Sequence, residues 1–100
     1  MQTETVAACL ESLGNPTRLT LYRELVKAGG SGLAVGELQT RLAIPASTLS
    51  HHVAHLVRTE LVSQEREGRV LRCRARFNTM QAVLQFLLEE CCAEENGACC

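Results

Sequence analysis

Apolar residues recur along most of the chain with the spacing of amphipathic α-helices. Four such segments precede residue 61, and glycine or proline separates most of them. Asn15 and Pro16 suit the start of the second helix, as a cap and a first-turn residue. The run at residues 29–32, which is mostly glycine, ends it. The pattern therefore predicts helices over residues 3–13, 16–28, 35–42 and 45–60.

A different period follows in residues 61–77, where apolar and polar positions alternate as in a β-strand. Two arms, residues 61–66 and 69–77, are predicted to form a hairpin that turns at Glu67 and Gly68. One face of the second arm carries Leu71, Cys73, Ala75 and Phe77, and the other carries Arg72, Arg74 and Arg76. A last helix is predicted from about Asn78 to Cys92, apolar over a wide arc.

This order of elements predicts a mainly α fold, a winged helix-turn-helix with a two-stranded β wing. With 100 residues the chain is long enough for one compact domain and too short for two. We expect residues 1–92 to form the DNA-binding and dimerisation domain, and residues 93–100 to form a cysteine-containing flexible tail that completes a sensor site.

The predicted second helix of the turn has a polar outer face without an acidic residue, where a solvated face normally mixes both signs. Such a face suits base edges in the major groove, and arginines of the wing suit the flanking phosphates. His52 is expected on the inward edge of this helix as a packing residue. The predicted DNA-binding residues are Ser47, Thr48, Ser50, His51, His55, Arg58, Arg66, Arg69, Arg72, Arg74 and Arg76.

Charge is distributed unevenly along the chain, although the net charge is only −1. All ten basic residues precede residue 77, and residues 1–88 hold only seven of the eleven acids, which leaves this part at +3. Local charge, rather than net charge, governs contact with phosphates. Double-stranded operator DNA is therefore the expected partner. A homodimer is expected through the first and last helices, at Val6, Leu10, Leu13, Val83, Leu84, Phe86 and Leu87.

Six cysteines are present, and their placement argues against a disulfide framework. Cys9 and Cys73 stand alone and are expected in the core. The other four form two adjacent pairs, Cys91-Cys92 and Cys99-Cys100, separated by a segment in which Asn96 and Gly97 favour a turn. Three converging thiolates suit a soft, three-coordinate centre such as trivalent arsenic or antimony. A divalent-metal site, a thiol redox switch and a tail without function remain alternatives.

Three runs resemble the signatures of the ArsR/SmtB family of repressors. These are Leu13 to Leu19 near the start, Ser47 to Val53 followed by Leu61-Val62, and Arg66 to Arg69 in the wing; the resemblance covers roughly residues 6–90. It implies a homodimer that represses an operon and leaves DNA when a metal or metalloid binds. The terminal cysteines resemble those of an arsenic-responsive subgroup, which implies arsenite, antimonite or methylarsenite as the inducer, bound by Cys91, Cys92 and Cys99 or Cys100.

The chain also departs from this family's patterns. Residues 33–38 contain no cysteine, so the inducer site that the family often has before the recognition helix is absent. The predicted last helix contains no His and no Asp, which excludes the family's zinc site on that helix. Glu60 stands where a glycine is usual, which puts the end of the recognition helix in doubt.

Enzyme and membrane classes fit the sequence poorly. An arsenate reductase needs an activated thiol beside an anion-binding loop or an arginine cage, whereas this tail is acidic, so we expect no enzyme activity. A protein that only stores metal would have no need of an arginine-faced wing. No apolar run of 18 residues occurs, and residues 1–11 carry two acids and no basic residue. We therefore expect a cytoplasmic protein without a membrane span.

Overall fold

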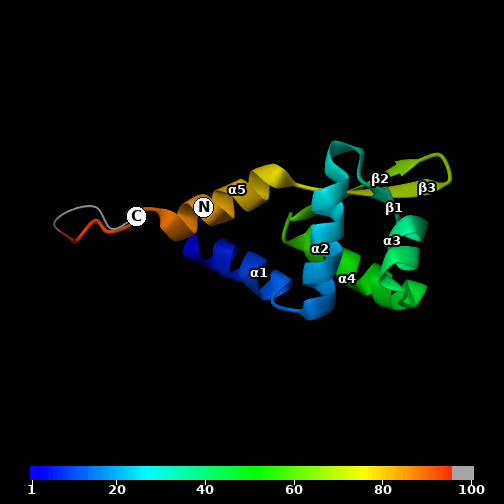
Figure 1. Ribbon diagram of the computed structural model, residues 1–100, viewed down its shortest axis with the longest axis horizontal. Helices are drawn as coiled ribbons and strands as arrows, with labels where there is room; N and C mark the ends of the chain where they lie inside the picture. Colours follow the sequence, from blue (N-terminus) through cyan, green and yellow to red (C-terminus); the bar gives the residue numbers. More distant parts are fainter. Residues whose placement is uncertain (96–100) are drawn as a thin grey trace.

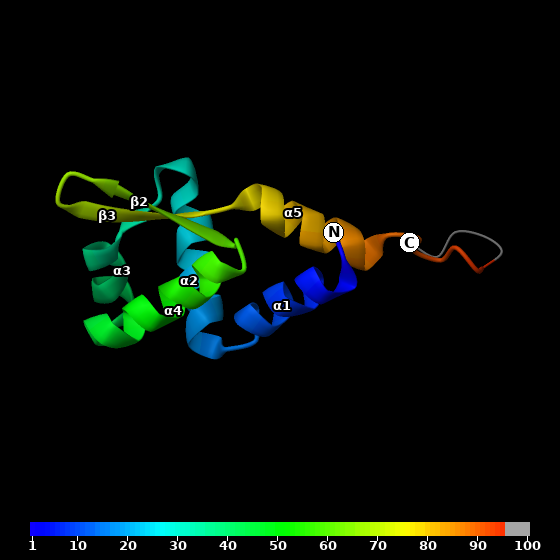
Figure 2. The ribbon, with the colours of Figure 1, turned by 180° about the vertical axis from the view of Figure 1, so that it is seen from behind.

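The computed structural model of the chain describes residues 1–95 and has the predicted winged helix-turn-helix architecture (Figure 1). In chain order the elements are α1 (Thr3–Leu13), α2 (Pro16–Ala28), the 3-10 helix η1 (Gly29–Ser31), β1 (Leu33–Ala34), α3 (Val35–Leu42), α4 (Ala46–Arg58), β2 (Val62–Glu67), β3 (Val70–Ala75) and α5 (Phe77–Leu88). The sheet and α2 to α4 form one half of the molecule, and α1 and α5 lie side by side in the other half (Figures 1 and 2).

Local sequence signals explain where α2 and α3 begin and end. The Asn15 side chain accepts hydrogen bonds from the N–H groups of Thr17 and Arg18, at 2.9 and 3.1 Å, as expected for a cap. Helix α2 ends at Gly29, where the backbone turns to a positive φ of 69°. Glu37 caps α3 by accepting from the N–H of Ala34 at 2.9 Å. The predicted bounds of both helices are therefore confirmed.

The sheet is antiparallel and has three strands in the order β1-β3-β2, so the hairpin is joined by a short strand that the sequence did not predict. Strand β1 consists of only two residues, too few for alternation to be visible. Glu67 pairs with Val70, which leaves Gly68 and Arg69 as the two-residue turn. The predicted turn at Glu67 and Gly68 was therefore wrong by one position, because Gly68 supplies the positive φ, 64°, that such a turn needs.

The hydrophobic core lies between the helices and the inner face of the sheet. Its fully buried leucines come from α2, α3, α4 and the segment before β2. Cys9 and Cys73 are buried in it, as predicted, and burial raises the pKa of both thiols. The buried apolar residues are Val6, Cys9, Leu21, Tyr22, Leu25, Leu33, Leu38, Leu49, Val53, Leu56, Leu61, Val62, Cys73, Ala75 and Val83.

Helix α5 is shorter than the sequence predicted, since it ends at Leu88 and not at Cys92. Two acids, Glu89 and Glu90, follow directly, and its last turn contains no basic residue. Acidic side chains are unfavourable at a helix C-terminus, where the backbone carbonyls carry negative partial charge. The chain leaves the helix in turns, with φ of 60° at Glu90 and 58° at Cys92. None of the helices within residues 1–95 is long and apolar enough to cross a membrane.

Candidate nucleic-acid interface

Helix α4 presents a polar face to solvent, because its apolar residues Leu49, Val53 and Leu56 are buried beneath it. Hydroxyl, imidazole and guanidinium groups on this face can reach base edges or phosphates. The ring of His51 lies edge-on to that of His52, with centroids 5.9 Å apart. Five predicted DNA-binding residues are exposed on this helix: Ser47, Thr48, Ser50, His51 and Arg58.

The expected outward position of His55 was wrong. Its Nδ1 lies 2.9 Å from the Oγ of Ser12, and its Nε2 lies 3.6 Å from a carboxylate oxygen of Glu11. Its side chain is only 21% exposed. His55 therefore faces α1 across the helix interface, a contact that the spacing within α4 does not reveal. The expected inward position of His52 is correct, since it is half-buried and its Nδ1 lies 3.4 Å from a guanidinium nitrogen of Arg18.

The arginines on the outer face of β3 are held by acids and carbonyls of the protein itself. Arg72 contacts Glu67 at 2.9 Å, and Arg74 contacts the same carboxylate at 3.0 Å and Glu65 at 3.5 Å. Both arginines also donate to backbone carbonyls of η1, at 3.3 and 3.0 Å. Arg76 contacts Glu60 at 3.0 Å. Each of these three arginines, which the sequence assigns to phosphate contacts, is therefore paired within the chain, so a phosphate would have to compete with the acids.

The acids that pair these arginines were missed in the sequence, and strand register was a signal for Glu65 and Glu67, although not for Glu60, which precedes the strand. Glu65 lies directly opposite Arg72 once the turn is placed at Gly68 and Arg69. Hydrogen bonds from Arg72 and Arg74 lower the pKa of Glu67, so its carboxylate is ionised at neutral pH. Within residues 1–95, Arg66 and Arg69 form no ion pair, and both are exposed. The unpaired cations of the wing therefore lie near its turn.

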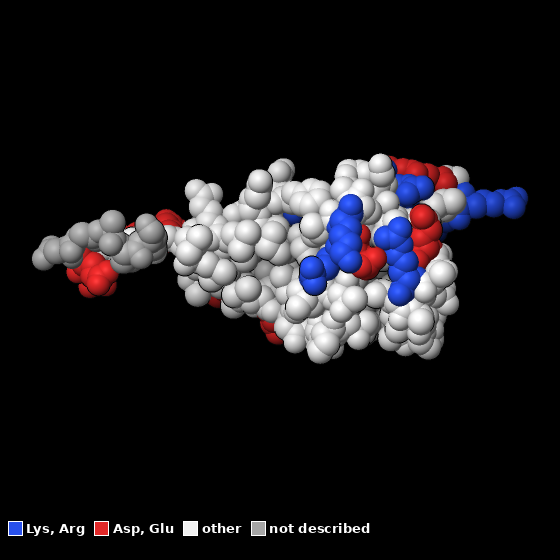
Figure 3. All heavy atoms as spheres, in the orientation of Figure 1, with Lys and Arg blue, Asp and Glu red and all other residues white. Residues whose placement is uncertain are grey.

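Basic side chains gather on the half of the molecule that carries the wing (Figure 3). Neither α1 nor α5 contains a lysine or arginine, and the face over these helices is largely uncharged in this view. Blue side chains project at the far end, where the β2–β3 hairpin ends (Figures 1 and 3). The half that carries the wing is therefore suited to contact with a polyanion, and the half formed by α1 and α5 is suited to contact with another protein.

The predicted dimer residues divide into buried and exposed groups. Val6 and Val83 are buried in the core of this chain, where α1 packs on α5. Leu13 and Phe86 are partly buried. Leu10, Leu84 and Leu87 are 42%, 53% and 52% exposed, and Leu88, which was not predicted, is 69% exposed. An apolar patch of this kind usually marks a protein interface.

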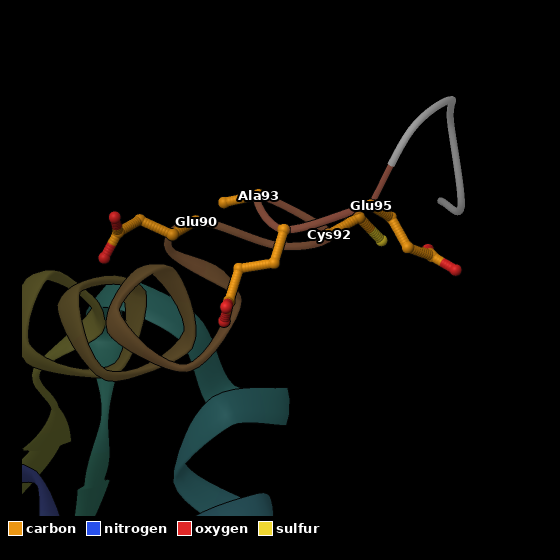
Figure 4. A pocket seen from close by; sticks show the side chains of 5 residues that line it. Glu90, Cys92, Ala93 and Glu95 are labelled. Atoms are coloured by element: carbon orange, nitrogen blue, oxygen red, sulfur yellow. The ribbon is translucent and has the colours of Figure 1, made fainter.

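The predicted inducer site begins just after α5, at Cys91 and Cys92. Their Sγ atoms lie 3.5 Å apart. Cys92 also lines an open hollow with Ala93 and the acids Glu90, Glu94 and Glu95 (Figure 4). Cys99 and Cys100 lie outside the described residues, and residues 1–95 contain no cluster of three metal-binding side chains.

Comparison with known families and structures gives a consistent assignment. A family model described as a helix-turn-helix domain matches residues 13–65. The transcriptional repressor BigR from Xylella fastidiosa is 31% identical, with a TM-score of 0.65, over 93% of this chain and 89% of that one. An ArsR-like transcriptional regulator from Rhodococcus is 26% identical, with a TM-score of 0.76, over 91% and 82% of the two chains.

A further similar structure is a homodimeric winged helix-turn-helix DNA-binding domain from Mycobacterium bovis. It is 22% identical, with a TM-score of 0.70, over 96% of this chain and 89% of that one, and at this identity it supports the fold alone. A search of curated protein sequences found no match. The Xylella and Rhodococcus structures are of transcriptional regulators, which agrees with the prediction that the chain is not an enzyme.

Proposed function

The chain belongs to the ArsR family of winged-helix transcriptional regulators, and we propose that it is a homodimeric repressor that leaves its operator when it binds trivalent arsenic. The proposal has two parts, a DNA-binding surface and a thiol site for the inducer. The observation that carries it is the position of Cys91 and Cys92, adjacent in the chain and directly after a helix that exposes an apolar patch. Ligands at these two thiols would lie close along the chain to the surface that we assign to the dimer.

Operator binding is assigned to the exposed face of α4 and the turn of the wing. Helix α4 contains no acidic residue, so nothing on its outer face repels phosphates. Ser47, Thr48, Ser50 and His51 are the readers of base edges, and Arg58, Arg66 and Arg69 are the phosphate contacts. In a dimer, two copies of α4 enter successive major grooves, about 34–36 Å apart. An imperfect palindrome is the expected operator.

Dimerisation is assigned to the exposed leucines of α1 and α5. Leu10, Leu84 and Leu87 leave about half of each side chain in water in the single chain, and a partner would cover them. The Mycobacterium bovis domain with the same fold is a homodimer. Val6 and Val83 contribute indirectly, because they hold α1 and α5 of one chain together.

The inducer is assigned to thiolates because arsenic(III) and antimony(III) are soft centres that favour sulfur. Cys91 and Cys92 supply two ligands, and Cys99 or Cys100 supplies the third. A monomethylated arsenic(III) needs only two thiolates, so it binds the first pair alone. Binding pulls on the chain immediately after α5, and α5 packs on α1. A coupling free energy of about 2–3 kcal/mol between inducer binding and DNA binding is sufficient for useful release of the protein from its operator.

Fluorescence anisotropy tests the proposal, with the reduced protein on a labelled fragment of the DNA upstream of its own gene. Arsenite is titrated in, and antimonite, methylarsenite and zinc follow in separate titrations. We expect arsenite to release the protein and zinc to have no effect. The variant Cys91→Ser/Cys92→Ser is expected to bind DNA normally and to ignore arsenite. Cys9→Ala is the matched control, because it removes a buried thiol in α1.

Single variants at Cys99 and Cys100 identify the third ligand. Release by zinc or by an oxidant, and not by arsenite, would replace the proposed inducer with a divalent metal or a redox signal. Absence of DNA binding at low salt would contradict the function as a whole.

A further inference from the structure

A chain of polar contacts joins the recognition helix to α1 and to the start of α2. Its members are Glu11, Ser12, Arg18, His52 and His55, and we call them the polar seam. His55 contacts Ser12 and Glu11, at 2.9 and 3.6 Å. Arg18 donates through Nε to the backbone carbonyl of Ser12 at 2.6 Å and contacts His52 at 3.4 Å. Two successive turns of α4 are thereby linked to one point, the end of α1.

Arg18 occupies an unusual environment for a guanidinium group. It is only 8% exposed, and within residues 1–95 no carboxylate lies within ion-pair distance of it. Burial of a charge without a counter-charge is unfavourable for stability. Ser12, its main partner, is fully buried and accepts through its backbone carbonyl. Hydrogen bonds to Ser12 and His52, and no ion pair among the described residues, therefore hold the guanidinium in place.

The remaining contacts of α4 with the core are apolar. Leu49, Val53 and Leu56 hold the helix against the core, but hydrophobic contact is non-directional and does not by itself fix the rotation or axial position of a helix. Hydrogen bonds depend on distance and angle, so they can fix the rotation and axial position of a helix. The polar seam lies on the flank of α4 that faces α1 and α2, and His52 lies edge-on to His51, one of the residues assigned to DNA.

We propose that Arg18 and Ser12 are positioning residues for operator recognition, which fix the orientation of α4 relative to α1 through His52 and His55. In a dimer built on α1 and α5, the same contacts set how each recognition helix is aimed at its groove. This inference rests on the proposed function for its DNA readout. Neither residue contacts DNA, and both act through the two histidines of α4.

The test compares Arg18→Met with Arg23→Met. Both variants remove one positive charge from α2, but Arg23 is exposed and has no ion pair within residues 1–95. Binding is measured on the upstream DNA fragment and on a scrambled duplex of the same length and composition. We expect Arg18→Met to bind the upstream fragment about tenfold more weakly than Arg23→Met, which equals about 1.4 kcal/mol. The two variants should bind the scrambled duplex equally.

Ser12→Ala is the second variant, because it removes only the hydroxyl that meets His55 and keeps the fold. It is expected to reduce the preference for the upstream fragment about threefold. A role in folding alone would lower binding to both duplexes by the same factor, as inactive protein would. Equal affinities of Arg18→Met and Arg23→Met for the upstream fragment would overturn the inference.

Amide hydrogen exchange without DNA separates this inference from the proposed function. In Arg18→Met, the amides of Val53 and Leu56 should exchange about tenfold faster relative to those of Leu21 and Leu25 in α2. Exchange that quickens equally in both helices would contradict a positioning role. If the wild-type chain fails to distinguish the two duplexes, the proposed function is wrong, and the exchange result still decides whether the seam holds α4.

Discussion

Replacement of Gly32 by alanine tests how closely the chain before α3 approaches the sheet. Gly32 has φ of 64° and ψ of −164°, a region that is almost restricted to glycine. A Cβ atom there would lie 2.2 Å from the carbonyl oxygen of Cys73 and 2.6 Å from Cγ of Arg74. The first of these atoms belongs to the backbone of β3, so the strand itself would have to move.

The expected loss of stability follows from three separate contributions. The backbone conformation costs an alanine about 1–3 kcal/mol. Displacement of packed atoms costs about 1–3 kcal/mol more, and the smaller entropy of the unfolded alanine chain returns about 0.4–1 kcal/mol. The free energy of unfolding should therefore fall by about 1–5.5 kcal/mol, which can be a large part of the roughly 5–15 kcal/mol typical of a domain.

Two other glycines serve as matched controls, and urea unfolding followed by circular dichroism is the measurement. Gly29 shares the positive φ, 69°, but a Cβ there meets nothing within 4 Å, so Gly29→Ala should show only the backbone cost. Gly36 lies in α3 with open space around it, and Gly36→Ala should be neutral or stabilising by up to about 1 kcal/mol. If Gly32→Ala costs no more than Gly29→Ala, the argument from close approach is refuted.

Three further predictions concern pH, charge and assembly. Burial, followed by the charge of Arg18, lowers the pKa of His52, so the unfolded chain binds a proton at this residue more readily than the folded chain does. The resulting contribution to the free energy of unfolding is complete above about pH 6.5 and is lost as the pH falls toward the folded pKa. Urea titrations at pH 7.5 and 5.5 should therefore show a smaller difference in the free energy of unfolding for His52→Gln than for the wild-type chain. Glu67→Gln should raise DNA affinity at low salt, because it frees Arg72 and leaves Arg74 only its longer contact with Glu65, and unchanged anisotropy would contradict their pairing in solution. Leu87→Asp should convert a dimer to a folded monomer in light scattering, whereas an unchanged mass would place the interface elsewhere.

Most elements of the fold could be predicted from the sequence because local signals specify them. The Asn15 cap and the glycine at residue 29 set the bounds of α2, and the period of Leu49, Val53 and Leu56 set the buried face of α4. These signals depend on neighbours within a few residues. The arrangement of helices around the wing then follows from the short connections between them.

The site was harder to predict, because the surroundings of several of its residues depend on tertiary contacts. His55 faces inward because Ser12, 43 residues away in the chain, offers it a hydrogen bond. Arg72 and Arg74 are paired because a one-residue shift of the turn brings Glu65 and Glu67 beside them. Hydrophobic period alone carries no information on either contact. The inducer and the dimer stay predictions, since they depend on a ligand and a second chain.

The paired arginines of β3 also limit how steeply DNA binding should depend on salt. A cation that already has a carboxylate partner displaces few condensed ions from DNA when it approaches a phosphate. Arg58, Arg66 and Arg69 are therefore the cations of each copy that contribute fully. For a dimer with about six such contacts, the slope of log K against log salt should be about −5. A count of all the arginines in the wing would predict a much steeper dependence, so the repressor should hold its operator over a wider range of ionic strength.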